Sequence, residues 1–325
     1  MREVSDMIEK KFMWCTLVHL GTNLWFEEGN HRGEQEVKLW KMPASPRARF
    51  DPEQWEKYLV LLKETGTNTI ILDLAEGLQY KSHPELAIEG SWDREKMTAE
   101  LAKMRSMGFD VIPKLNFSAT HDVWLGKYAR MVSTEEYYRV CKDLIDEVAE
   151  IFKPEYIHIG MDEEDYETQK LYDYVVIRQN DLWWHDLYYF VDCVEKHGAR
   201  AIMWPYYARS NPDEFIEKCP KSVIQSVWYY LNEFEGDIGP ENEEKVRPFK
   251  LLSEAGFDLM PTGSIEFVND NLEMMAAFCK KHIAPERLVG FMQTTWESVE
   301  PQWEDYLVRG AKSLREARRI YEGDI

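Results

Sequence analysis

The chain has 325 residues, enough for one large hydrophobic core or two ordinary ones. Its formal net charge of −20 argues against nucleic acid and anionic membranes as partners, because both require a basic surface. Aromatic residues make up 13% of the chain, with 12 Trp and 17 Tyr, an excess that fits either packing or flat walls for sugar rings.

Short apolar runs alternate with helical patterns along the chain. Continuous runs rich in Ile, Val, Leu and Met are typical of strands that are covered on both faces. The expected strands are 14–20, 69–73, 110–115, 156–160, 201–204, 223–227, 258–261 and 289–293. The expected helices are 51–64, 93–107, 134–152, 182–196, 212–218, 243–254, 271–281 and 303–321.

Four of the expected helices are followed by a glycine. Gly66, Gly108, Gly198 and Gly256 each follow a helix, at the position where a glycine commonly ends one. Strict alternation of strand and helix predicts an α/β protein with a single (β/α)8 TIM barrel over residues 1–325. Long loops at about residues 25–50 and 231–242 follow strands, so we expect them to wall a pocket. A doubly wound sheet is the rival fold, but the chain has no Gly-rich phosphate loop.

Cysteine spacing and the N-terminal segment indicate the environment of the protein. The five cysteines are scattered, with no CxxC pair and no Cys/His metal spacing, which favours reduced thiols over a disulfide framework. Residues 1–11 are charged and lack the apolar core of a signal peptide. No run of about 18 apolar residues exists. We therefore expect a cytoplasmic protein without a membrane span, and the sequence leaves a homo-oligomer open.

The most informative stretch is residues 157–163, Ile-His-Ile-Gly-Met-Asp-Glu, which predicts a short buried strand ending in two carboxylates, Asp162 and Glu163. In a (β/α)8 barrel the catalytic groups lie at this end of the strands. The alternative is the start of a helix, because acids favour its first turn. We expect Glu164 and Asp165 to be such a solvated helix start. Consecutive acids lack the alternate spacing of a Ca²⁺ loop, so no metal site is predicted.

Carboxylates and tryptophans dominate the residues that leave the expected strands. Trp204, Trp228 and Trp296 follow three of these strands and predict aromatic faces for sugar rings. Acids at the same end of the barrel would bind hydroxyls and the glycosidic oxygen. The other substrate-binding candidates are Asp73, Glu76, Asn116, His121, His158, Tyr229 and Glu297.

The segment His158-Ile-Gly-Met-Asp162-Glu163 resembles the His-x-Gly-Gly-Asp-Glu motif of glycoside hydrolase family 20, the β-N-acetylhexosaminidases. Residues 68–76 and the following His-Pro-Glu-Leu at 83–86 are similar to the second strand of the family and its Tyr-Pro-Glu-Leu. Residues 108–113 resemble Gly-Ile-x-Val-Ile-Pro, and residues 289–297 resemble the final Gly and Trp-x-Glu region. The resemblance covers nearly the whole chain.

The resemblance implies a role for each matched residue. Glu163 would protonate the glycosidic oxygen, and Asp162 would orient the substrate's own 2-acetamido group as it attacks the anomeric carbon. His158 would order the floor of the site. The implied activity is that of an exo-acting, retaining hydrolase that releases terminal β-linked N-acetylhexosamine. Its partner would be an oligosaccharide or glycoconjugate, and no cofactor is expected.

Several positions depart from the family pattern. The first strand lacks the Arg that usually grips sugar hydroxyls, and Met161 replaces the second Gly of the motif. The segment Pro-Glu-x-Asp-x-Pro-Gly-His reads Pro113-Lys114-Leu-Asn116-Phe-Ser-Ala-Thr-His121, so an acid becomes an amide and the His is displaced by one place or lost. The seventh-strand Tyr that contacts the acetamido oxygen is not evident.

These departures keep two alternatives open. The first is a (β/α)8 glycosidase for a sugar without the 2-acetamido group, with Glu76, Asp73 or Glu297 as the second carboxylate. The second is a carbohydrate-binding barrel without turnover, although such a protein has no need for a protonated acid. Either Tyr229 or Tyr230 is a candidate replacement for the missing Tyr.

Overall fold

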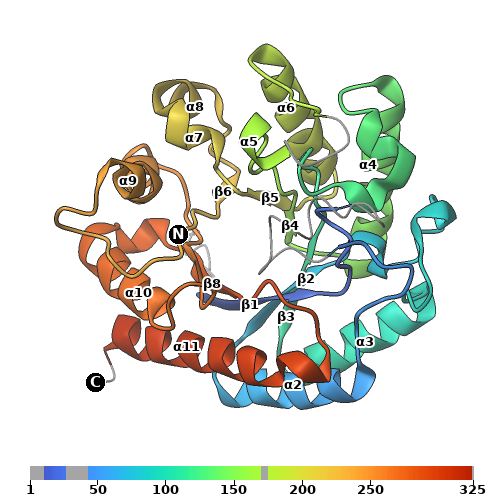
Figure 1. The fold of residues 1–325 in the computed structure, drawn as a ribbon, viewed down its shortest axis with the longest axis horizontal. Coiled ribbons are helices and arrows are strands. Elements are labelled where there is room, and N and C mark those ends of the chain that lie inside the picture. The colour runs from blue at the N-terminus through green and yellow to red at the C-terminus, as the bar shows by residue number, and fades with distance from the viewer. Residues whose placement is uncertain (1–10, 27–42, 170–174, 324–325) are drawn as a thin grey trace, which may run out of the picture.

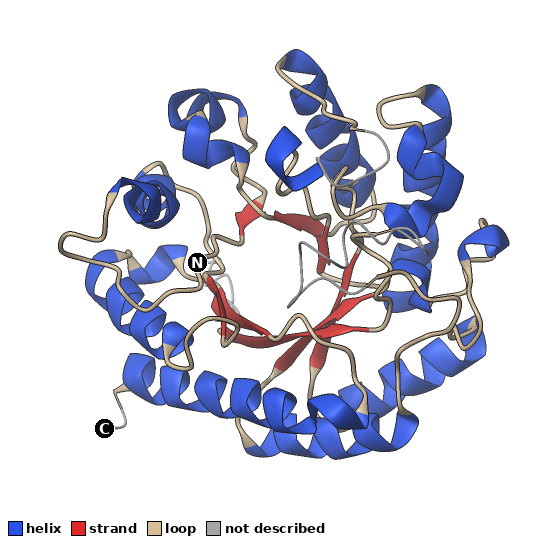
Figure 2. Ribbon diagram, in the orientation of Figure 1, coloured by secondary structure: helices blue, strands red, loops and turns tan. Residues whose placement is uncertain are grey.

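The computed structural model, which describes residues 11–26, 43–169 and 175–323, places eight parallel strands in one sheet. Their order is β6-β5-β4-β3-β2-β1-β8-β7. Parallel bridges between residues 225 and 259 and between 228 and 262 join the two ends of this order. The strands therefore close into an inner ring, and helices surround it (Figures 1 and 2). The predicted (β/α)8 barrel is confirmed.

The elements follow the predicted alternation. The strands are β1 (Met13–His19), β2 (Thr69–Asp73), β3 (Asp110–Lys114), β4 (Tyr156–His158), β5 (Arg200–Met203), β6 (Ile224–Gln225), β7 (Thr262–Ser264) and β8 (Gly290–Thr294). The helices are α2 (Pro52–Glu64), α3 (Arg94–Ser106), α4 (Glu135–Phe152), α5 (Tyr166–Gln169), α6 (Asp181–Glu195), α7 (Tyr207–Ser210), α8 (Pro212–Lys218), α9 (Pro240–Glu254), α10 (Asn271–His282) and α11 (Glu304–Glu322).

Local sequence explains where the outer helices begin and end. Asp51 accepts a hydrogen bond from the backbone N–H of Gln54 and Pro52 follows it, so α2 begins there. Thr134 caps α4 in the same way through the N–H of Tyr137. Gly66 and Gly108 adopt φ of 91° and 89° just after α2 and α3, a conformation that glycine reaches without a steric penalty.

The seventh strand begins later than the sequence predicts. The apolar segment 258–261 was expected to form it, but the continuous ladder lies at Thr262–Ser264. Leu259 forms only isolated bridges, to Gln225 and to Leu288. Pro261 explains the difference, because it has no N–H to donate and so interrupts the ladder between the two segments.

The core has two parts. Inside the ring, Cys15, Leu17, Ile71, Ile112, Ile202, Ile224, Met260 and Met292 are all buried and in contact. A larger apolar layer lies between the strands and the surrounding helices. This inner layer fills the interior of the barrel, and among the described residues the end where the strands leave the ring is the one that carries a cavity.

The five cysteines are all buried and free. Among the described residues, no helix combines the length and the apolar character that crossing a bilayer requires.

Candidate active site

The chain leaves β4 through a tight turn that presents two carboxylates to one side. Gly160, Met161 and Glu163 have φ of 81°, 77° and 51°. A Cβ at Gly160 would lie 3.3 Å from the backbone nitrogen of Phe117, so this position requires glycine both for its φ and for space. Neighbouring side chains on a regular strand point to opposite faces. The turn removes that constraint and lets Asp162 and Glu163 face the same cavity.

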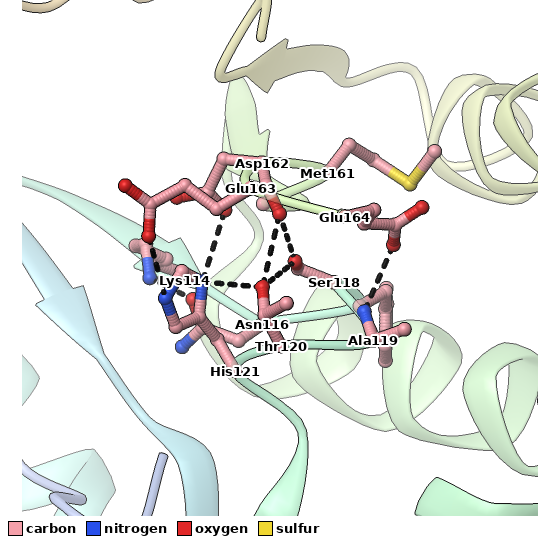
Figure 3. Close-up of polar contacts among 12 residues, drawn as sticks. Lys114, Asn116, Ser118, Ala119, Thr120, His121, Met161, Asp162, Glu163 and Glu164 are labelled. Carbon is pink, nitrogen blue, oxygen red and sulfur yellow. Dashed lines mark hydrogen bonds and ion pairs between the residues drawn. The ribbon is translucent and has the colours of Figure 1, made fainter. Parts of the chain in front are cut away.

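His121 joins the two carboxylates (Figure 3). Its Nδ1 lies 3.2 Å from Oδ1 of Asp162, and its Nε2 lies 3.5 Å from Oε2 of Glu163. The backbone carbonyl of Asp162 accepts hydrogen bonds from the hydroxyls of Ser118 and, at 3.1 Å, of Thr120. The segment that follows β3 therefore fixes the position of the acid pair.

The charge of His121 follows from this contact. Burial alone would lower the pKa of the imidazole, but the charge of Asp162 and the hydrogen bonds to Asp162 and Glu163 outweigh burial and raise the pKa to about 9. His121 is therefore a cation at neutral pH.

In the described part of the chain, the donor atoms of His121, Asp162 and Glu163 lie within 4.8 Å of one another, a spacing that could hold a metal ion. A metal would have to displace the imidazolium proton, because a ligating His is neutral. The protonated imidazole already places a positive charge between the two carboxyl groups, so the donor set does not call for a metal.

A cavity of about 560 Å³, part of it open to solvent, lies over the acid pair. It is lined by Leu24, Trp25, Lys114, Asn116, His121, Asp162, Glu163, Trp204, Trp228, Tyr230, Glu266 and Trp296. The ring centroids of Trp204 and Trp228 are 5.8 Å apart, and those of Trp204 and Trp296 are 6.1 Å apart. The structure thus brings the three predicted tryptophans together as an aromatic wall beside the carboxylates.

His158 lies beneath this wall. Its Nδ1 accepts the N–H of Gly160 at 3.1 Å, and its ring lies 4.6 Å from that of Trp204. Burial and the charge of Lys114 lower the pKa of His158 well below its usual value, so the imidazole is neutral. It supports the turn after β4 and the indole above it, and it does not line the cavity.

Not every predicted site residue reaches the cavity. Asp73 is fully buried below it, in contact with Lys114, Asn116 and His19. Asn116 does line the cavity, beside Lys114.

Three further predicted site residues also lie away from the cavity lining. Glu76 is 1% exposed and accepts the backbone N–H groups of Thr22 and Asn23 at 2.7 and 3.0 Å. Tyr229 packs on Phe234 and points away from the site, whereas its neighbour Tyr230 lines the cavity. Burial and the charges of Glu266 and Glu300 raise the pKa of Glu297 to about 7, but its side chain is not part of the lining.

The two long loops differ in their relation to the cavity. Residues 27–42, most of the first, lie outside the described residues, while Trp25 at its start lines the cavity. Residues 231–242 do not line it. In this loop Phe234 packs on Phe249 and Phe278.

The expectation of a solvated helix start at Glu164 is wrong. Its side chain is 4% exposed and forms an ion pair with Arg178, which also contacts Asp186 at 2.7 Å. Glu164 accepts the N–H of Ala119 at 2.8 Å as well. A buried carboxylate is tolerated only when it is paired, and Arg178 supplies that partner. The residue that follows the acid pair, Glu164, is therefore anchored by a buried ion pair with Arg178.

The lining includes residues that were not selected from the sequence. Lys114 is the last residue of β3, in a largely buried strand where a lysine is unexpected. Glu266 follows β7, and Leu24 and Trp25 follow β1. Their positions after strands were the available signal, since residues at strand exits converge on one end of a barrel.

Comparison with known proteins agrees with this geometry. Residues 112–237, which contain the acid pair, match the family model described as glycosyl hydrolase family 20, catalytic domain. A search of curated protein sequences found no match. The resemblance to glycoside hydrolase family 20 is thus confirmed over residues 112–237, and the family match supports the predicted class of enzyme, a glycoside hydrolase.

Solved structures of similar fold carry related descriptions. A β-N-acetylhexosaminidase from Bacteroides fragilis is 13% identical with a TM-score of 0.61, over 93% of this chain and 65% of that one. An exo-β-N-acetylglucosaminidase from Vibrio harveyi, in complex with N-acetylglucosamine, is 15% identical with a TM-score of 0.62, over 94% and 54%. A β-N-acetylhexosaminidase from Streptomyces coelicolor A3(2) is 13% identical with a TM-score of 0.62, over 94% and 64%. The chain spans less than two thirds of each, and at such identities the likeness shows the fold.

Proposed function

We propose that the protein is an exo-acting, retaining glycoside hydrolase that releases terminal β-linked N-acetylhexosamine by substrate-assisted catalysis. The observation that carries the proposal is the pair Asp162 and Glu163, both directed into an aromatic cavity at the exit of β4. Three tryptophans offer apolar faces to a sugar ring, and the adjacent carboxylates supply an acid and an electrostatic partner. The cavity opens at one end of the barrel, which supports action on a terminal sugar.

The proposed reaction has two steps. In the first, Glu163 donates its proton to the glycosidic oxygen while the acetamido oxygen of the substrate bonds to the anomeric carbon, and the bond to the leaving group breaks. Asp162 holds the acetamido N–H and stabilises the positive charge of the oxazolinium ring. In the second, Glu163 accepts a proton from water, which attacks the anomeric carbon and opens the ring with net retention.

Neighbouring side chains suit these roles. His121 contacts both carboxyl groups from one side and holds their orientation. Tyr230 lines the cavity and is a candidate donor to the acetamido oxygen.

Two of the candidate protein nucleophiles, Asp73 and Glu76, are not placed to attack a sugar in the cavity. Asp73 is bound to Lys114, Asn116 and His19 beneath the floor. Glu76 is held by two backbone N–H groups. Neither carboxylate lines the cavity, so neither is placed to attack a sugar there.

An activity panel of aryl β-glycosides, with and without a 2-acetamido group, tests the proposal. Hydrolysis should require the acetamido group, and a thiazoline mimic of the oxazolinium should inhibit far more strongly than the product sugar. Asp162→Asn should weaken the mimic and slow turnover. Equal or better hydrolysis of plain glycosides, without any advantage of the thiazoline, would favour the alternative glycosidase.

The role of Glu163 has a separate test. Glu163→Gln should reduce turnover of unactivated glycosides by roughly 10²- to 10⁴-fold, the usual contribution of a general acid. The loss should shrink for aryl leaving groups that need little protonation. Equal losses for both kinds of substrate would reject Glu163 as the acid, and sugar binding without any turnover would favour a binding protein.

A further inference from the structure

A lysine lies at the floor of the cavity. Lys114 is the last residue of β3, in register with Asp73 of β2 and His158 of β4. Its side chain is only 2% exposed, yet the residue lines the cavity. Because His158 precedes Asp162 along the chain as it leaves the barrel, Lys114 lies deeper in the barrel than the acid pair.

Two contacts fix the Lys114 ammonium group. It donates one hydrogen bond to Oδ2 of Asp73 at 2.8 Å and a second to Oδ1 of Asn116. Nδ2 of Asn116 donates in turn to Oδ1 of Asp73 at 2.6 Å. An ammonium group has three N–H donors. Among the described residues the ammonium group has these two acceptors, which leaves one donor for a molecule that enters the cavity.

The charges around Lys114 favour a neutral partner for this donor. Burial alone would raise the pKa of Asp73, but Lys114 and His19 outweigh burial and lower the pKa to about 2, so Asp73 stays anionic. The negative charge of Asp73 balances the positive charge of Lys114 from below the cavity. Among the cavity-lining residues, Lys114 and His121 are cationic, whereas Asp162, Glu163 and Glu266 carry carboxyl groups, so with Asp73 below them the site offers no surplus positive charge to an anion.

We propose that Lys114 donates a hydrogen bond to a hydroxyl group of the terminal sugar, on the side of the ring away from the glycosidic bond. This rests on the proposed function, which places the glycosidic oxygen at Glu163. The non-reducing side of the ring then enters the cavity first, and its C3, C4 and C6 hydroxyls are the candidates. Lys114 thus selects a neutral hexosamine in which this hydroxyl is free.

The wild-type protein tests the proposal directly. We expect one of the 3-, 4- and 6-deoxy aryl N-acetylhexosaminides to lose roughly 10- to 100-fold in kcat/KM, the range for a hydrogen bond from a charged donor. Losses below about threefold for all three would overturn the proposal, since they are smaller than such a hydrogen bond provides. A sulfate ester that binds better than the parent hydroxyl would also overturn it.

Variants identify the donor. Lys114→Met removes the ammonium group, and the double variant Lys114→Met with Asp73→Asn also avoids leaving an unpaired buried carboxylate. Lys57→Met, at an exposed lysine paired with Glu53, is the control and should leave kcat/KM unchanged.

In either Lys114 variant the ratio between the parent and the sensitive deoxy substrate should fall to near one. A loss of the same factor on every substrate would mean that Lys114 is only structural.

Binding separates this proposal from the proposed function. Calorimetric titration of the wild type and both variants with N-acetylhexosamine and its deoxy forms requires no turnover. Dependence of affinity on the same hydroxyl, seen only when Lys114 is present, supports the proposal even if no glycoside is hydrolysed. Hydrolysis of acetamido glycosides without this dependence leaves the proposed function standing and overturns the role of Lys114.

Discussion

Replacing Glu164 with Gln should destabilise the protein and misplace the acid pair, although Glu164 does not line the cavity. Its carboxylate accepts two hydrogen bonds from Nε and Nη2 of the buried Arg178 and one from the N–H of Ala119. Gln keeps the shape and one carbonyl oxygen. It removes the negative charge and turns an N–H group toward the guanidinium.

The expected loss of unfolding free energy depends on the partner that Arg178 keeps, Asp186. Removing one partner of a buried pair costs about 3–5 kcal/mol, and the lower end applies because Asp186 stays 2.7 Å away. Unfolding entropy is about 2.1 cal/mol/K per residue near 60 °C, or roughly 700 cal/mol/K for 325 residues. A loss of about 3 kcal/mol therefore lowers Tm by roughly 4 °C.

Calorimetry of Glu164→Gln against Glu53→Gln measures this effect. Glu53 pairs with Lys57 on the surface and is 80% exposed, so its change should stay within about 0.5 kcal/mol. The Glu164 variant should also lose kcat on aryl glycosides at temperatures where it is folded, because the neighbouring Glu163 loses its support. Equal Tm values for the two variants would refute the role of the buried pair.

Three other changes test the site. The pKa of His121 is raised from 6.5 to about 9. Protonation of its imidazole therefore adds roughly 3 kcal/mol to the free energy of unfolding below about pH 6.5, and this contribution is lost as the pH rises through about 9. His121→Asn should abolish this part of the pH dependence of unfolding. Trp296→Ala should weaken sugar binding at least fivefold, from about 1 kcal/mol of lost aromatic contact, and Trp303→Ala should not. Tyr230→Phe should lower kcat/KM by about two- to tenfold through one lost hydrogen bond, whereas Tyr229→Phe should have no effect in the same assay.

The exit of β4 was predictable because the expected barrel places the residues that follow its strands at the catalytic end, and because the segment resembles the motif of glycoside hydrolase family 20. The contacts of Lys114 were not predictable, because its partner Asp73 belongs to another strand and only the register of β2 against β3 brings the two together. The burial of Glu164 was not predictable for a similar reason. Its partner Arg178 lies in an irregular segment, where no periodicity relates the two residues.

Alternation along a strand offered a signal that was available in the sequence. Trp228 was assigned to the cavity, and residues two apart along an extended chain share a face. Tyr230 therefore belonged with Trp228, and Tyr229 belonged to the opposite face, as the structure places them.

The turn after β4 also shows why one glycine of the family motif is retained and the other is not. Both Gly160 and Met161 have positive φ, which costs a residue with a side chain about 1–2 kcal/mol. At Gly160 a Cβ would also press against the backbone of residues 116 and 117, at 3.3–3.4 Å. Met161 has room: its side chain is buried, and its sulfur lies 3.6 Å from Nη2 of Arg178. Burial of a Met side chain contributes about 1.5–3 kcal/mol, enough to offset the strain. Position 160 thus requires glycine for both space and φ. Position 161 favours glycine for φ alone, so Met161 is tolerated there because its side chain packs against Arg178, whose ion pair supports the acids.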